Sequence, residues 1–111
     1  MDNTAACIVM TTASTEDEAE ALATAIVEAR LAGCVQVQRV RSFYVWQDAL
    51  HHEPEWLLLI KTLGARYAEL EAFIRERHSY ETPEIVQVPV TAGSADYLRW
   101  LAAGSTPPLQ A

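Results

Sequence analysis

The sequence predicts an α+β fold built as a single domain. Three observations lead to this prediction. The chain has 111 residues, a length that suits one domain with one core. Half of its residues are hydrophobic, which is enough for a packed interior. Short apolar segments with strand character alternate with segments of helical periodicity in the order β-α-β-β-α-β, and one further helix follows.

The first strand and the first helix are predicted from composition and spacing. Residues 5–12 are apolar and partly β-branched, which is typical of a buried strand. Ser14 or Thr15 is suited to cap the helix that follows, in which apolar residues recur at helical spacing opposite an acidic face. We expect Gly33 to end this helix.

A long hairpin is predicted next. Residues 34–46 alternate apolar and polar side chains as a strand does, and a slip in this alternation at residues 39–40 indicates a bulge or a bend. Residues 47–54 are polar and predict a connecting loop. Residues 55–63 predict a second strand whose apolar run is buried on both faces.

The second half of the chain predicts a helix, a strand and a final helix. Residues 64–78 place apolar side chains on one side of a helix, and residues 84–91 form the last strand. Ser94 or Asp96 begins a short apolar helix. We assign residues 1–104 to the domain and expect residues 105–111, which include two prolines, to form a flexible tail.

This order of elements corresponds to two right-handed βαβ units that share one antiparallel sheet, the ferredoxin-like arrangement. Its helices cover one face of the sheet. The other face, to which we assign Trp46 and Trp56, needs a further surface, because a monomer would expose a large apolar patch. We therefore expect the chain to self-associate with closed cyclic symmetry.

The composition restricts the partners and the location of the protein. The net charge is −7 and the eight basic residues are scattered, which argues against nucleic acid as a main partner. No apolar run approaches the roughly 20 residues of a membrane span, and the N-terminus lacks the pattern of a signal peptide. Cys7 and Cys34 form no CxxC motif and are expected to be small buried hydrophobes in a reducing compartment. We expect a cytoplasmic protein with no membrane contact.

The segment His-Ser-Tyr-Glu-Thr-Pro-Glu at residues 78–84 is the most informative stretch of the sequence. Pro83 restricts Thr82 to extended geometry, so the preceding helix must stop before it. An imidazole, a phenol and two carboxylates stand where a plain connection would use Gly, Asn or Ser. We expect a functional site here, because the elements on either side fix its geometry.

Three histidines are candidate metal ligands. His78, at a helix end, is either a ligand or pocket residue, or a histidine that the helix dipole favours at that position. His51 and His52, beside Glu53, carry donors that suit a surface Cu(II) or Zn(II) ion. Adjacent residues of a strand point apart, so this site needs a turn or the convergence of three copies in a trimer. A solvated loop is the alternative.

A second candidate site is a pocket between subunits. Lys61, the only lysine, ends an apolar strand and is suited to anchor an anionic ligand or to pair with a carboxylate such as Glu84. The alternative is a lysine that extends to solvent along the strand end. The other residues expected to line this cleft are Tyr44, Trp46, Glu53, Tyr80 and Glu84. For the aromatic residues, interface packing is the alternative.

The sequence gives little support for catalysis. Cys34 and His78 are the one obvious nucleophile and base, but a thiol after a helix end is disfavoured as a thiolate by the helix dipole. Glu81 and Glu84 could share a proton, yet nothing near them in the sequence marks them as more than solvated charges. GxGxxG, P-loop and HExxH motifs are absent. An acylphosphatase-like hydrolase would need a phosphate-binding turn after the first strand, where residues 12–17 are acidic instead. We predict a protein that is not an enzyme and requires no cofactor.

Several separated motifs resemble those of the CutA divalent-cation-tolerance family. In chain order they are Leu31-Ala32-Gly33-Cys34-Val35, Ser42-Phe43-Tyr44-Val45-Trp46, Ile60-Lys61-Thr62, the segment 78–84, Val88-Pro89-Val90-Thr91 and Asp96-Tyr97-Leu98-Arg99-Trp100-Leu101. The resemblance extends over residues 7–101. It implies a ferredoxin-like fold in a PII-like homotrimer, with long strands of neighbouring subunits paired, and a part in tolerance to divalent metals, copper above all. It implies no particular reaction.

The copper site that the resemblance implies is altered in this chain. The family site combines a cysteine near the end of the first strand with two adjacent histidines at the helix exit. Here Thr11 stands at the cysteine position and Arg77 at the first histidine position, so that only His78 remains. A hydroxyl and a guanidinium do not replace the thiolate and imidazole ligands that select copper.

Two functional hypotheses follow. The first is a trimeric, non-enzymatic protein of divalent-cation tolerance that binds Cu(II) or another divalent metal weakly through His78 and carboxylates, or acts through a partner. The second is a PII-like sensor that binds a small anionic ligand against Lys61 in the cleft between subunits and signals by moving the hairpin loop.

Overall fold

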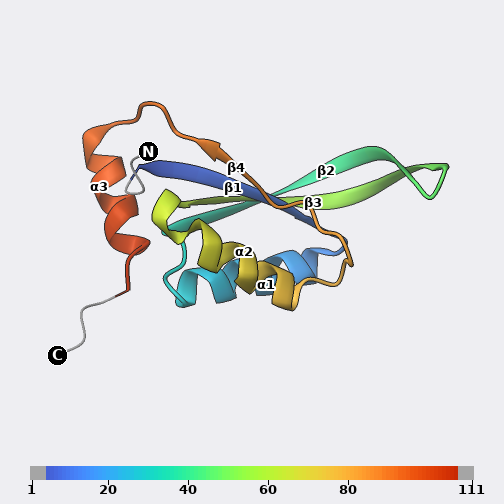
Figure 1. Cartoon of the computed structure of the whole chain (residues 1–111), viewed down its shortest axis with the longest axis horizontal. Coiled ribbons are helices and arrows are strands. Elements are labelled where there is room, and N and C mark those ends of the chain that lie inside the picture. Colours follow the sequence, from blue (N-terminus) through green and yellow to red (C-terminus); the bar gives the residue numbers. More distant parts are fainter. Residues whose placement is uncertain (1–4, 108–111) are drawn as a thin grey trace.

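The computed structural model describes residues 5–107 (Figure 1). Its elements, in chain order, are β1 (Ala6–Ala13), α1 (Glu16–Glu28), β2 (Cys34–Trp46), β3 (Ala49–Leu63), the 3-10 turn η1 (Gly64–Arg66), α2 (Tyr67–Arg77), β4 (Val86–Pro89) and α3 (Ala95–Gly104). The strands form one antiparallel sheet in the order β2-β3-β1-β4. The predicted α+β class and order of elements are confirmed.

The core lies between one face of the sheet and the helices α1 and α2, which lie together below the sheet in Figure 1. The alternation of side chains along a strand turns Val9 of β1 and Leu58 and Ile60 of β3 toward these helices. There they pack in one cluster with Ile26 of α1 and Ile74 of α2. All five side chains are fully buried, so this layer holds the helices on the sheet.

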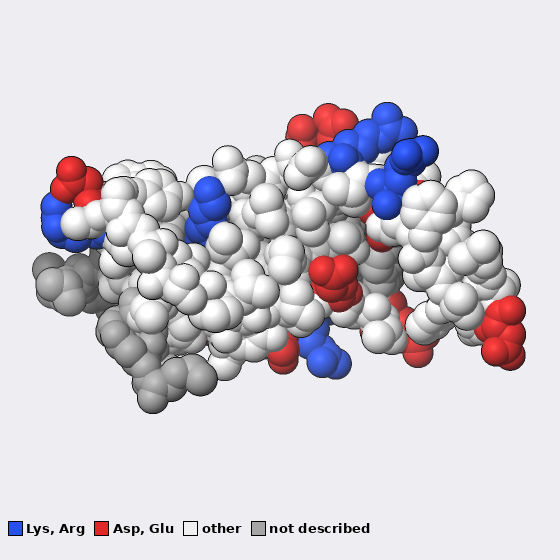
Figure 2. Space-filling model, turned by 90° about the horizontal axis from the view of Figure 1, so that it is seen from above, with Lys and Arg blue, Asp and Glu red and all other residues white. Residues whose placement is uncertain are grey.

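The opposite face of the sheet carries a second set of apolar side chains, and α1 and α2 do not cover it. Alternation and register give this open face the residues Ile8, Met10, Leu57, Leu59, Val86 and Val88. Seen from that side, the surface is mostly uncharged (Figure 2). Trp46 lies on this face, as predicted. Trp56 was predicted to lie there too, but it is two residues before Leu58 on β3, so its side chain is on the same face as Leu58 and packs against the core.

The strands β2 and β3 form one long hairpin that extends beyond the helices (Figure 1). Their pairing runs without interruption to Trp46 and Ala49. Only Gln47 and Asp48 form the turn, and both have positive φ, 52° and 62°. Two successive left-handed residues are what the two-residue type I′ turn requires, and its twist matches that of the strands.

The loop predicted for residues 47–54 is wrong, because this segment is strand apart from the two turn residues. Of the bulge or bend predicted at residues 39–40, the bulge is excluded by the continuous pairing. The side chains there are polar because this part of the hairpin lies beyond the helices, so neither of its faces packs on the core of the chain. Polarity therefore indicated a loop where a solvated strand is found.

The first helix ends before the predicted Gly33, because Arg30 adopts a left-handed backbone with φ 56°. The N–H of Leu31 then donates to the carbonyl of Ile26 at 3.1 Å, which closes the helix end. Gly33 has a different role. A Cβ atom there would lie 3.0 Å from Cδ1 and 3.1 Å from the carbonyl oxygen of Leu101, so glycine allows α3 to approach.

The remaining elements follow the prediction with shifted ends. The second helix starts with η1, β4 is shorter than residues 84–91, and Ser94 is the N-cap of α3. After α3, Ser105 is buried and the carbonyl of Thr106 accepts a hydrogen bond from Nε of Arg30 at 2.9 Å. Residues 108–111 of the predicted tail lie outside the described residues. Within residues 5–107, no helix is long and apolar enough to cross a membrane.

Candidate functional site

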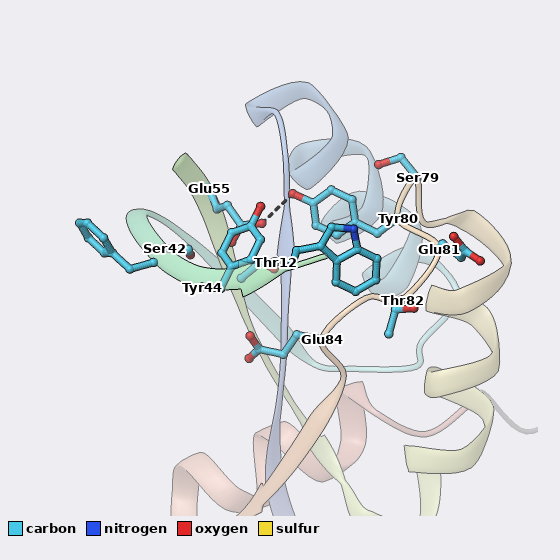
Figure 3. Close-up of a pocket in the computed structure, with 11 residues that line it drawn as sticks. Thr12, Ser42, Tyr44, Glu55, Ser79, Tyr80, Glu81, Thr82 and Glu84 are labelled. Atoms are coloured by element: carbon cyan, nitrogen blue, oxygen red, sulfur yellow. Dashed lines mark hydrogen bonds between the residues drawn. The ribbon is translucent and has the colours of Figure 1, made fainter. Parts of the chain in front are cut away.

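A cavity of about 640 Å³ lies where the β2–β3 hairpin meets the segment between α2 and β4 (Figure 3). Its lining residues are Thr12, Ser42, Phe43, Tyr44, Trp46, Glu55, Ser79, Tyr80, Glu81, Thr82 and Glu84. Three of them are glutamates and none is basic, so the described wall of the cavity is acidic. Part of the segment 78–84 that the sequence singled out therefore lines a real concavity.

The strongest polar contact in this cavity joins Tyr80 and Glu55. The Tyr80 hydroxyl donates to Oε2 of Glu55 at 2.6 Å, as the dashed line in Figure 3 marks. Glu55 is only 7% exposed, although its side chain is a carboxylate. Burial, the hydrogen bond to Glu55 and the negative charge of that carboxylate raise the pKa of Tyr80 well above its ordinary value.

Tyr44 lies beside the same carboxylate. Partial burial together with the negative charges of Glu53 and Glu55 raises the pKa of Tyr44. The two phenols and Glu55 therefore form one electrostatic cluster, in which both tyrosines stay protonated at neutral pH. This cluster places the carboxylate of Glu55 at one wall of the cavity.

His78 is a structural residue in this chain. Its Nδ1 accepts a hydrogen bond from the backbone N–H of Tyr80 at 3.0 Å, so Nδ1 carries no proton. Nε2 then holds the proton and donates to the carbonyl of Thr12 at 2.7 Å. The side chain has no exposed surface. Both ring nitrogens are thus used within the protein, and neither has a lone pair free for a metal.

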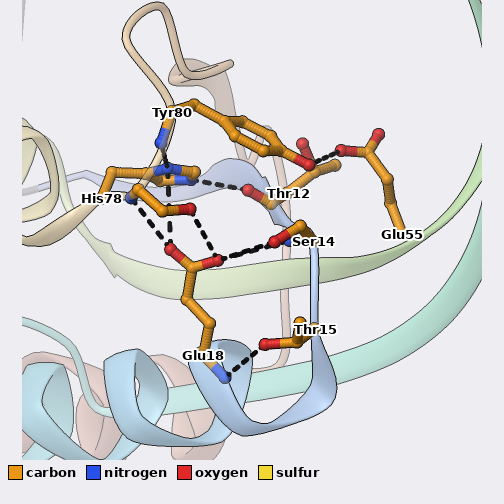
Figure 4. Close-up of polar contacts among 8 residues, drawn as sticks. Thr12, Ser14, Thr15, Glu18, Glu55, His78 and Tyr80 are labelled. Carbon is orange, nitrogen blue, oxygen red and sulfur yellow. Dashed lines mark hydrogen bonds and ion pairs between the residues drawn. The ribbon is translucent and has the colours of Figure 1, made fainter.

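Glu18 joins the start of α1 to the segment after α2 (Figure 4). Its two carboxylate oxygens accept from the backbone N–H and the hydroxyl of Ser79, each at 3.0 Å, and the N–H of Ser14 approaches at 3.4 Å. Burial alone would raise the pKa of Glu18, but these hydrogen bonds lower it. Nδ1 of His78 lies 3.9 Å from Oε2 of Glu18, but as the acceptor of the Tyr80 N–H it has no proton to donate to that carboxylate.

The hairpin histidines lie on a strand rather than in the predicted loop. His51 stacks on Tyr44 and His52 on Phe43, with ring centroids 5.4 and 5.6 Å apart, and the two imidazoles face opposite sides of β3. They cannot chelate one ion together. Glu53 lies on the same side as His51, and its Oε1 is 3.9 Å from Nδ1 of His51.

The predicted pocket is assembled only in part. Tyr44, Trp46, Tyr80 and Glu84 line one cavity, and Glu53 lies next to Tyr44 without lining it. Lys61 is elsewhere: its Nζ lies 5.8 Å from the ring centroid of Tyr97 in α3. Within a single chain, the lysine therefore does not anchor a ligand in this cavity.

The positions altered in the implied copper site do not form a metal site. Thr11 is fully buried on the face covered by the helices, and Arg77 lies over the ring of Phe73 at 3.6 Å. Cys7 and Cys34 are both free, and Cys34 is not among the contacts found for His78. Among residues 5–107, no three His, Cys, Asp or Glu side chains lie close enough to hold a metal ion.

Comparison with known proteins assigns the chain to a family. The family model described as "CutA1 divalent ion tolerance protein" matches residues 7–104. The chain belongs to the CutA1 family. The divalent-cation tolerance proteins CutA of Thermus thermophilus and Pectobacterium atrosepticum are 39% and 36% identical to it, over 85% and 88% of this chain and 92% and 90% of theirs.

Solved CutA structures share the fold of the chain. A structure described as the periplasmic divalent cation tolerance protein CutA from Archaeoglobus fulgidus superposes with a TM-score of 0.89 at 29% identity. The match covers 91% of this chain and 99% of that one. The resemblance predicted from separated motifs is thereby confirmed at the level of the CutA1 family and its α+β fold.

Sequence reasoning on this CutA1 chain missed two residues of the site. Glu18 was interpreted only as part of the acidic first turn of a helix, and Glu55 only as the start of an apolar strand. The position of Glu55 could have indicated its role. A carboxylate at the start of an otherwise apolar strand is a candidate for a buried charged group, which is rare and needs a partner. Glu18 carries none, since acidic residues are common in the first turn of helices.

Proposed function

We propose that the chain is a non-enzymatic homotrimer that acts in divalent-cation tolerance and binds Cu(II) or Zn(II) transiently at the pair His51 and Glu53. Membership of the CutA1 family supports the general role. The separation of 3.9 Å between Nδ1 of His51 and Oε1 of Glu53 carries the assignment to this pair. Zinc takes nitrogen and oxygen ligands at about 2.0–2.2 Å in tetrahedral geometry, so a small closing rotation of these partly exposed side chains lets one ion bridge the two atoms.

The chemistry of the pair suits the proposed metals. Imidazole and carboxylate are ligands of Zn(II) and Cu(II), and both side chains are partly exposed at the hairpin. Two ligands from one chain leave the remaining positions to water or to another copy of the hairpin. Binding at such an open site is weak and reversible, which fits a role in tolerance better than permanent storage. We propose no resident cofactor.

The proposed trimer is supported by two features of the single chain. The open face of the sheet exposes Val86 and Val88 beside half-buried Ile8 and Met10. β2 is an edge strand of the sheet, so its outer N–H and C=O groups are available to a strand of another copy. In a closed ring of copies, the open face of each chain is covered and the outer edge of β2 is paired, so that no free β2 edge is left to aggregate. The free thiols Cys7 and Cys34 agree with the reducing cytoplasm that we propose as its location.

The PII-like alternative has less support as an anion sensor. Within one chain Lys61 is away from the cavity, and the cavity wall has three glutamates, which repel an anionic ligand. An anion would need basic side chains supplied by another copy. We therefore place divalent-cation binding ahead of anion sensing.

Calorimetric titration with Cu(II) and Zn(II) tests the metal proposal. The expected result is saturable binding by the unaltered protein that His51→Ala weakens by about tenfold or more, since a first ligand is lost. His52→Ala is the matched control: it removes the neighbouring imidazole and an equivalent aromatic stack from the opposite side of β3. Its affinity should be unchanged, as should that of His78→Ala. An equal loss in His52→Ala, or no loss in His51→Ala, refutes the assigned pair.

A further inference from the structure

The acidic cavity contains a buried charge that lacks a counter-charge. Glu55 is 7% exposed, and the one hydrogen bond found for its side chain comes from the neutral hydroxyl of Tyr80. Among residues 5–107, no Lys, Arg or His side chain lies within ion-pair distance of it. A buried carboxylate is costly unless a positive group or several hydrogen bonds compensate it. Within the described residues, the carboxylate of Glu55 therefore has no positively charged partner.

The walls around Glu55 favour an organic cation over a metal ion. Tyr44, Trp46 and Tyr80 supply aromatic rings, whose faces attract alkylammonium and guanidinium groups. Magnesium and calcium need six or more oxygen ligands, and the described carboxylates do not converge in a group of three. A cavity of about 640 Å³ also exceeds the space that a bare ion would fill.

We propose that this cavity is a binding site for an alkylammonium group. The ammonium lies against the carboxylate of Glu55, with Glu84 from the opposite segment as a second negative charge. The hydrocarbon part of the ligand packs on Tyr44 and Trp46. The Tyr80 hydroxyl, which donates to Oε2 of Glu55, holds that carboxylate in position and leaves its other oxygen to the ligand.

Two sources can supply this group. One is a free small amine. The other is Lys61, the only lysine of the sequence, from a second copy of the chain, because Lys61 is half-buried on the open face and is not used by its own cavity. The chemistry of recognition is the same in both cases. The free-amine source depends on no part of the proposed function, whereas the Lys61 source rests on the proposed self-association of the chain.

The experiment measures binding of n-butylammonium to the full-length protein by calorimetry and by thermal shift. The probes 1-butanol and butyrate, neutral and anionic molecules of similar length, serve as ligand controls. The expected result is saturable binding of the ammonium ion, and of neither control, to the unaltered protein or to Lys61→Met, weakened by about tenfold or more when Glu55→Gln is introduced. Glu20→Gln removes the same charge from an exposed position of α1 and should bind as the unaltered protein does.

The same titration on Lys61→Met separates the two sources. Binding by the unaltered protein identifies a free amine as the ligand. Binding that appears only in Lys61→Met identifies the lysine of a second copy, which the free ammonium then replaces. No binding to either protein overturns the proposal, and so does equal binding of 1-butanol. If Glu55→Gln fails to fold by circular dichroism, Tyr44→Leu takes its place, and undiminished binding to that variant also refutes the site.

Discussion

The hydrogen bond between Tyr80 and Glu55 joins a loop to a strand that is distant in sequence. It does so at a partly buried position, where a hydrogen bond to a charged group contributes more to stability than one at the surface. His78 works beside it, with one nitrogen on Thr12 and the other on the Tyr80 backbone. The main role of these residues is therefore structural, because they hold the segment after α2 against the sheet.

We predict that Tyr80→Phe lowers the free energy of unfolding by about 1–3 kcal/mol at pH 7, the range expected for a lost hydrogen bond to a charged group. The pKa of Tyr80 lies above its ordinary value in the folded protein. Above about pH 10 the unfolded chain loses the phenol proton while the folded protein keeps it, so stability falls as the pH rises through this range. The deficit of the variant should therefore shrink above pH 10.

Urea unfolding at pH 7 and at several values above pH 10 measures both effects. Tyr97→Phe is the control, because no hydrogen bond is found for the Tyr97 hydroxyl among the described residues and its side chain is exposed. The interpretation of Tyr80 fails if the two variants have the same stability at pH 7.

The sequence identified some of these residues and misjudged others for physical reasons. Tyr80 and Glu84 stand out because a phenol and a carboxylate are unusual at a helix-to-strand join. For His78 the sequence left open a metal ligand, a pocket residue or a histidine favoured by the helix dipole, since sequence does not reveal whether a ring nitrogen has a backbone partner. The burial of Glu55 depends on a contact across the fold, which one-dimensional spacing does not encode.

At the scale of elements, the type and order of each helix and strand could be predicted, and the ends could not. Arg30 ends α1 in a left-handed conformation that usually requires glycine or asparagine. The end of the helix was therefore predicted at Gly33, the next glycine in the sequence. The turn at Gln47 and Asp48 lacks the Asn-Gly signature of a type I′ turn. Sequence reasoning relied on composition at both places, and the backbone conformation was set by the hydrogen bonds of the surrounding structure.

We predict that Gly33→Ala lowers the free energy of unfolding by about 1–3 kcal/mol, the usual range for overpacking. The new Cβ would meet the side chain and the backbone carbonyl of Leu101 at 3.0 and 3.1 Å, so α3 must move. Gly93→Ala is the matched control, because its Cβ would meet only the side chain of Leu98, at 3.1 to 3.3 Å. Thermal unfolding of both variants should show the larger loss at Gly33, and equal losses would contradict the close approach of α3.

At the scale of the whole molecule, the open face was the most useful sequence-based expectation. It follows from the count of layers alone: two helices cover one face of a four-stranded sheet, and apolar residues continue on the other. The assignment of Trp56 to that face was wrong because the register of β3 turns it toward the core.

Light scattering of the purified protein should give a mass about three times 12.3 kDa if the proposed homotrimer forms. Val88→Asp, on the open face, should reduce this mass, because the charge would be buried between subunits. Val27→Asp is the control and places the same charge on the outer side of α1. Val27 is 41% exposed and Val88 is 38% exposed, so the two positions are matched, and the control should leave the mass unchanged. A monomer at micromolar concentration would contradict the proposal.

The uninterrupted pairing of β2 with β3 also bears on how the chain reaches its fold. From the two-residue turn, each further pair of residues closes a loop only slightly larger than the last, so the ribbon can zip with a small entropy loss at every step. The pairing of Ile8 with Val88 joins two segments that are distant in sequence. It closes a much larger loop, so its entropy cost is higher. The arm that projects beyond the helices thus has the smallest loop-closure cost of the sheet pairings, which favours its early formation, although a two-stranded ribbon gains lasting stability only when it packs on other surfaces.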